Sequence, residues 1–206
     1  MATLEENLLY PLILLLVGGV ISFVLGTWLT NRWQNNKKKL DIKVELMLKI
    51  DETINRQISK SLSISLGSIL KKTLPTQEEQ NTEVENIKNW YFLEAKGIQS
   101  KLSTYFPETE LGRRWDYYAR TLNGYVSACY VYLVEEDKQN AVKPHLDRII
   151  EYIKSTGNKK YEEDGLLGRI TSNFNTDEMV GDLTAVFWVE AENIQRDIMK
   201  TPIKIF

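Results

Sequence analysis

The chain of 206 residues has a formal net charge of −2, a single histidine and a single cysteine, and 43% of its residues are hydrophobic. This length and composition suit one folded domain with a short appended segment, and they exclude an intrinsically disordered chain. Beyond residue 36 the chain has 25 basic residues (26 less Arg32) and 26 acidic residues (28 less Glu5 and Glu6). This balance predicts no basic surface for nucleic acid. A single cysteine excludes an internal disulfide.

An apolar run near the N terminus predicts a transmembrane helix. Residues 8–29 read LLYPLILLLVGGVISFVLGTWL, and fourteen of these twenty-two residues are Leu, Ile, Val or Phe. A helix needs about 20 apolar residues to cross a hydrocarbon core about 30 Å thick. A cleaved signal peptide is the alternative, but such a peptide has a basic N-terminal region, whereas Glu5 and Glu6 precede this run. We therefore expect residues 8–30 to span the lipid bilayer once.

Basic residues flank this run on its C-terminal side only, where they are Arg32, Lys37, Lys38, Lys39 and Lys43. The positive-inside rule places that side of the membrane in the cytoplasm. The sequence thus predicts a single-pass protein of the cell membrane with its N terminus outside. Its expected parts are a short extracytoplasmic tail (residues 1–7), the span (8–30), a basic juxtamembrane segment (31–39) and a cytoplasmic domain (40–206).

Three small residues in the run, Gly18, Ser22 and Gly26, recur every four positions and so share one helix face. Small residues allow the backbone of another helix to approach closely. We expect this face to contact a second copy of the chain, forming a homo-oligomer, or the helix of a partner membrane protein. The alternative is that these residues have no partner, because glycine is frequent in membrane helices.

Two helices are predicted between the basic segment and Pro107. The apolar residues of the first recur at steps of about 3.7 and are Met47, Ile50, Ile54, Ile58, Leu62, Leu66 and Ile69. Residues 61–66 also alternate Ser with Leu or Ile, as a strand would, but the helical flanks favour a helix that ends at Pro75. The second helix follows an acidic first turn, and its apolar residues are Val84, Ile87, Tyr91, Ile98 and Leu102.

The third helix, predicted over residues 109–136, has the strongest pattern. Its apolar residues follow alternating steps of four and three, the spacing of a coiled-coil seam, and are Leu111, Trp115, Tyr118, Leu122, Tyr125, Cys129 and Tyr132. We expect it to be the central helix of a bundle. Arg113, Arg114, Trp115 and Tyr118 also form a possible partner surface, because arginine and aromatic residues concentrate binding energy. The alternative is a core helix whose arginines are solvated.

Two further long helices complete an all-α fold, in which one N-terminal transmembrane helix precedes a cytoplasmic bundle of about four to five helices. Pro144 is expected in the first turn of the fourth helix, which Gly157 ends. A short helix is expected over residues 166–171, because a loop of about twenty residues without structure is unusual. Asn175 and Glu178 predict a capping box for the last helix, which ends before Pro202. Its predicted buried residues are Val180, Leu183, Phe187, Ala191, Ile194 and Ile198.

No catalytic, cofactor-binding or metal site is predicted. His145 and Asp147 are two residues apart on a helix and do not share a face, so they form no general-base pair. Glu190 and Glu192 diverge for the same reason, and carboxylate-bridged metal sites need Glu-x-x-His pairs that this chain lacks. Burial of Cys129 in an aromatic seam would raise its pKa and leave the thiol inert. An enzyme is therefore not the preferred interpretation.

Three functions are compatible with these features. We favour a membrane-tethered, non-catalytic interaction protein that acts as an adaptor or accessory subunit of a membrane-associated complex. The second is a small-ligand sensor or an enzyme with a pocket inside the bundle, lined by Tyr118, Tyr125 and Tyr132. The third is a membrane-acting effector that oligomerises through its span.

Overall fold

The computed structural model describes the backbone of residues 3–70, 76–134, 138–159, 161, 164–172 and 177–204. The side chains of residues 3–18, 65–70, 77, 80, 133–134, 138–139, 171–172 and 177–179 lie outside this description. Every regular element among the described residues is a helix, which confirms the predicted all-α class. The chain divides into two compact units, Met1–Val44 and Glu45–Phe206.

The first unit contains the N-terminal part of helix α1, which extends over Thr3–Leu70. The side chains of residues 19–38 are exposed, and among the large hydrophobic ones Phe23 is 75% exposed. Within the part of the chain that the structure describes, no helix has both the length and the apolarity that crossing a membrane requires. Residues 8–18 of the predicted span lie outside the described side chains, so the span stays a prediction.

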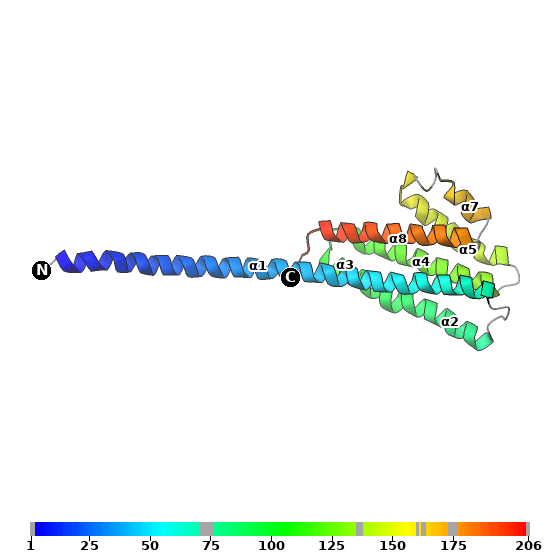
Figure 1. Ribbon diagram of the computed structural model, residues 1–206, viewed down its shortest axis with the longest axis horizontal. Helices are drawn as coiled ribbons and strands as arrows, with labels where there is room; N and C mark the ends of the chain where they lie inside the picture. The colour runs from blue at the N-terminus through cyan, green and yellow to red at the C-terminus, as the bar shows by residue number, and fades with distance from the viewer. Residues whose placement is uncertain are drawn as a thin grey trace. The chain divides into compact units, whose positions relative to one another are not determined.

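The second unit is a helical bundle (Figure 1). Its elements after α1 are α2 (Gln77–Asn89), η1 (Trp90–Ala95), α3 (Lys96–Tyr105), α4 (Leu111–Val134), α5 (Lys138–Ser155), α7 (Leu166–Ser172) and α8 (Asp177–Lys200). Helix α4 packs against α2, η1, α3, α5 and α8, which confirms its predicted central position. The hydrogen bonds that join the C-terminal part of α1 to the bundle include those from Trp90 Nε1 to the Thr53 carbonyl (3.3 Å) and from Gln195 Nε2 to Asp51 Oδ1 (2.5 Å).

The predicted seam of α4 forms the bundle core. Trp115, Tyr118 and Tyr125 are each 0% exposed, and Cys129 is 3% exposed. Phe187 of α8 packs against this seam, with its ring centroid 5.9 Å from that of Tyr118 and 5.3 Å from that of Tyr125. All six residues predicted to be buried on the last helix are buried, because α8 lies along the seam of α4.

One π-helical turn, η1, sets the register between α2 and α3. The buried residues on this continuous helix are Ile87, Trp90, Ala95, Ile98 and Leu102. The step of five from Trp90 to Ala95 brings both onto the inner face, because a π-turn accommodates one residue more than an α-turn. Tyr91 of the predicted stripe is therefore only half-buried, because Trp90 takes the inner position. Val84, which precedes the π-turn, also lies outside the core and is 38% exposed.

Specific residues mark where several of these helices begin and end. Thr76 and Glu79 form a capping box at the start of α2, and Gly157 follows α5 with a φ of +67°, a conformation that glycine adopts without strain. The short helix α7 is present. Pro144 lies inside α5 rather than in its first turn, because the helix already begins at Lys138. Asn175 and its capping box lie outside the described residues.

Candidate functional site

The four residues predicted as a partner surface do not share one surface. Trp115 and Tyr118 are 0% exposed, and the Trp115 Nε1 donates a hydrogen bond to the Ala95 carbonyl at 2.8 Å. Arg113 and Arg114 are exposed and form ion pairs, Arg113 with Glu110 and Arg114 with Asp197. The two aromatic residues therefore belong to the core and the two arginines to the solvated surface.

The predicted tyrosine-lined pocket is occupied by packed side chains. Tyr118 and Tyr125 direct their hydroxyls at backbone carbonyls of α8, at 3.0 Å to Phe187 and 3.5 Å to Val180. Tyr132, at the far end of the seam, is half-buried. Tyr118 and Tyr125 thus help to hold α8 against α4.

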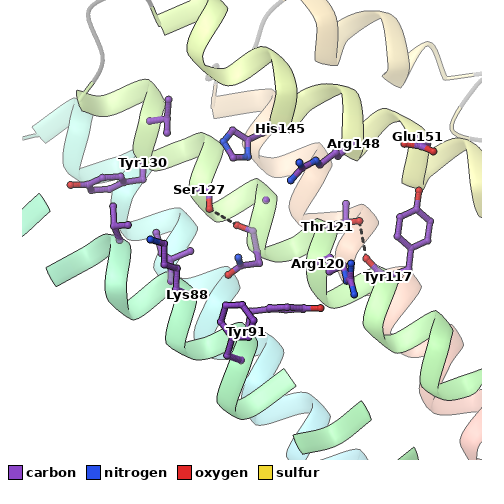
Figure 2. Close-up of a pocket in the computed structure, with 16 residues that line it drawn as sticks. Lys88, Tyr91, Tyr117, Arg120, Thr121, Ser127, Tyr130, His145, Arg148 and Glu151 are labelled. Carbon is purple, nitrogen blue, oxygen red and sulfur yellow. Dashed lines mark hydrogen bonds between the residues drawn. The ribbon is translucent and has the colours of Figure 1, made fainter. Parts of the chain in front are cut away.

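A cavity of about 720 Å³ lies on the opposite side of α4, between α2, η1 and α5. We call it the α4 groove. Figure 2 shows its walls: Lys88 and Tyr91 reach it from α2 and η1, and His145 and Arg148 reach it from α5. Its floor is a second series of residues on α4 with alternating steps of three and four, namely Tyr117, Arg120, Gly124, Ser127 and Val131. Ligand pockets commonly enclose about 300–1,000 Å³, so the groove is large enough for a small molecule.

The charged residues of the groove are unequally paired. Arg120 forms an ion pair with Asp116 at 2.9 Å. Within the described residues, Lys88 and Arg148 take part in no ion pair. The only carboxylate that lines the cavity among those residues, Glu151, lies at one end beside Tyr117 (Figure 2). The groove therefore has two positive charges available to a ligand.

Asp116 organises one rim of the groove. Its Oδ1 accepts hydrogen bonds from the Tyr91 hydroxyl at 2.8 Å and from Lys96 Nζ at 2.7 Å. Burial by itself raises the pKa of this carboxyl, but the hydrogen bonds from Lys96 and Tyr91 and the positive charge of Arg120 outweigh burial and leave the pKa lowered. The ionised carboxylate holds η1 to α4 and fixes the Tyr91 ring at the edge of the cavity.

His145 is half-buried in the groove wall. Because α5 begins at Lys138, this residue lies well inside the helix and faces α4. Its Nδ1 is buried without a hydrogen-bond partner, 4.0 Å from the point that a Cβ on Gly124 would occupy. Burial lowers the pKa of His145, and the charge of Arg148 lowers it further, so the ring is neutral at pH 7.

No family model, curated protein or solved structure matches the chain.

The groove offers binding groups rather than a reactive pair. Its side chains supply cations, hydroxyls, an amide and aromatic rings. Among the described residues, no three His, Cys, Asp or Glu side chains are placed to hold a metal ion. Glu190, whose burial the sequence did not reveal, accepts a hydrogen bond from the Tyr161 hydroxyl at 3.2 Å and so has a partner in the core. The arrangement fits recognition of a ligand better than catalysis.

Sequence reasoning missed the groove although two signals were present. The series on α4 from Tyr117 to Val131 has the same spacing as the aromatic seam, but its residues are mostly polar. His145 and Arg148 are three residues apart, so they share a helix face. Hydrophobic periodicity does not detect a regularly spaced series of polar residues. These residues line a cavity only because α2 and α5 pack against α4.

Proposed function

We propose that the chain is a membrane-tethered, non-catalytic interaction protein, an adaptor or accessory subunit whose bundle lies on the cytoplasmic side. The observation that carries this proposal is the exposure of apolar side chains around α1, where Val20 is 62%, Phe23 75% and Leu25 52% exposed. A helix that is apolar on all sides is stable when it lies in a membrane or a protein interior. The uncharged run over residues 8–29 and the basic residues after it support a tether with the bundle inside the cell.

The C-terminal end of the proposed span has the residues that a membrane interface favours. The guanidinium of Arg32 lies 5.3 Å from the ring centroid of Trp28, and Lys37 Nζ lies 5.6 Å from that of Trp33. Tryptophan concentrates at the headgroup level, and basic side chains there contact anionic lipid. Thr27 donates its hydroxyl hydrogen to the Phe23 carbonyl at 2.8 Å, so it needs no partner in the hydrocarbon.

The small-residue face of α1 is the proposed contact within the membrane. Ser22 and Gly26 line a hollow on the helix surface together with Thr30, which continues the four-residue spacing. A Cβ added at Gly26 would meet no atom within 4 Å. This small-residue face allows close approach by the helix of a second copy or of a membrane-protein partner.

The π-turn supplies the proposed contact on the bundle. Phe92 and Leu93 follow each other in η1 and are 65% and 72% exposed. π-Turns often occur at functional sites, and adjacent exposed apolar residues suit burial against a partner chain. Leu93 also borders a second cavity of about 710 Å³, whose charged residues are Arg56, Lys60 and Glu94. We propose that a partner protein buries Phe92 and Leu93.

Copurification of the tagged full chain from mild detergent, with identification of the bound chains, tests this function. We expect Phe92→Ser with Leu93→Ser, and separately Gly18→Ile with Ser22→Ile, to reduce the retained partner at least fivefold. The matched controls are Val189→Ser with Met199→Ser on the bundle, where the two residues are 42% and 41% exposed, and Leu14→Ile with Phe23→Ile on the span. Equal recovery of every bound chain with all four double variants would overturn the proposed contacts.

A further inference from the structure

We propose that the α4 groove binds a small organic anion that has a planar ring, with Arg148 and Lys88 attracting its charged group and the aromatic side chains contacting its ring. The groove adjoins the proposed protein contact, because Phe92 borders the cavity, whereas Leu93 does not line it.

The charge of the ligand follows from the unpaired cations. Arg148 projects into the cavity from α5, and Lys88 projects from the opposite wall on α2 (Figure 2). Neither is in an ion pair with a described residue, whereas Arg120 nearby is held by Asp116. An arginine in a partly enclosed cavity binds a carboxylate or phosphate through charge-assisted hydrogen bonds, often two at once. The ligand is therefore an anion.

The hydrogen-bonding groups of the ligand are inferred from buried polar atoms of the groove that have no hydrogen-bond partner. Asn123 Oδ1, Tyr130 Oη and His145 Nδ1 are buried without a hydrogen-bond partner among the described residues, and all three residues line this one cavity. Buried polar atoms in folded proteins nearly always have partners, because an unpaired one costs the free energy of its desolvation. A ligand with hydrogen-bond donors and acceptors besides its charge would supply these partners.

The planar ring of the ligand is inferred from the aromatic side chains that line the groove. Tyr91 and Phe92 of η1 and Tyr117 and Tyr130 of α4 all border the cavity, so two helical elements supply its aromatic rings. Aromatic side chains prefer offset or edge-on contact with another ring. The Tyr91 ring is oriented by Lys96 Nζ at 5.4 Å and by the Arg120 guanidinium at 5.8 Å from its centroid, so this wall is held in place before a ligand arrives.

Isothermal titration calorimetry on the full chain in phosphatidylcholine nanodiscs tests the site, with empty nanodiscs as the blank. The probes are two pairs that differ in charge, 1-naphthoate with 1-naphthamide and adenosine 5′-monophosphate with adenosine. We expect at least one anion to bind tenfold or more tightly than its neutral counterpart, because the charged group gains hydrogen bonds that the neutral one lacks. Two anions that bind no better than their neutral counterparts would overturn the proposal.

Arg148→Gln is expected to weaken binding of the preferred anion at least tenfold and to leave its neutral counterpart nearly unchanged. Lys88→Gln is expected to weaken it less, because a lysine ammonium acts as a point charge, whereas an arginine guanidinium can form two hydrogen bonds to one anion. The matched control is Arg196→Gln, because Arg196 is exposed on α8 and does not line the groove. Leu93→Ser should bind the anion as the unaltered chain does, which separates this site from the protein contact. Unaltered anion affinity in both Arg148→Gln and Lys88→Gln, with thermal unfolding unchanged, would show that the groove is not the anion site.

Discussion

Replacing Trp115 by alanine is expected to lower the free energy of unfolding of the bundle by about 3–5 kcal/mol, the usual cost of truncating a large buried aromatic residue. Trp115 is 0% exposed and stacks on Tyr118 with ring centroids 5.6 Å apart. Its Nε1 also donates the 2.8 Å hydrogen bond to the Ala95 carbonyl, at the end of the π-turn. Alanine removes the packed volume and this link between α4 and η1 together. Urea unfolding followed by circular dichroism measures the loss.

Trp115→Phe separates the two contributions. Phenylalanine keeps most of the apolar volume but cannot donate to Ala95, so about 1–2 kcal/mol of loss is expected from the hydrogen bond and the smaller ring. A change below about 1 kcal/mol for Trp115→Ala would mean that the indole is not packed in the core, and the partner-surface interpretation of Arg113, Arg114, Trp115 and Tyr118 would be the better one.

Replacing Tyr125 by alanine is expected to lower the free energy of unfolding by about 3–5 kcal/mol for the same reason. Tyr125 is 0% exposed and lies against Phe187. Burial raises the pKa of its hydroxyl, and the negative charge that Cys129 would carry when ionised adds to the rise, so the group stays protonated at neutral pH. Unfolding in urea at pH 7 is the measurement.

Phenylalanine at this position provides the matched control. The Tyr125 hydroxyl is 3.5 Å from the Val180 carbonyl, at the limit of a hydrogen bond, so Tyr125→Phe is expected to be nearly neutral. Tyr118→Phe removes a 3.0 Å bond to the Phe187 carbonyl and is expected to cost about 1 kcal/mol. Equal losses for Tyr125→Phe and Tyr125→Ala would contradict the account, because the stabilisation would then reside in the hydroxyl rather than in the packed ring.

The periodicity of the sequence was sufficient to predict most of the fold. The apolar stripe of α8 is buried as expected, and so is the heptad seam of α4 apart from the half-buried Tyr132, because each pattern is long and is interrupted by no proline or helix-ending glycine. The π-turn was not predictable in this way, since the predicted stripe counted Tyr91 at an α-helical step where Trp90 is the buried residue. One extra residue in a helical turn changes which side chains face the core in all the turns that follow. When the spacing between apolar residues varies between three, four and more positions, the sequence does not show where that extra residue lies.

Buried polar residues were equally hidden from sequence reasoning. Thr53, Gln57 and Ser61 of α1 are 0%, 2% and 0% exposed, although the sequence pattern had pointed to the apolar residues beside them, Ile54, Ile58 and Leu62, of which Leu62 is only half-buried. A helix packed on more than one side buries a face wider than its apolar stripe, and that width depends on its neighbours rather than on its own residues. The α4 groove was missed for the same reason, because its polar floor becomes a cavity only when α2 and α5 pack beside it.

The tether is tested most directly by labelling intact cells with a membrane-impermeant maleimide. A cysteine placed at Ala2 is expected to react, and a cysteine placed at Lys160 is expected to react only after the cells are opened. The unaltered chain is the background control, because its native Cys129 is only 3% exposed. Labelling at Lys160 with none at Ala2 in intact cells would reverse the proposed orientation. Recovery of the chain in the supernatant after cell breakage, with neither position labelled before it, would contradict the membrane tether itself.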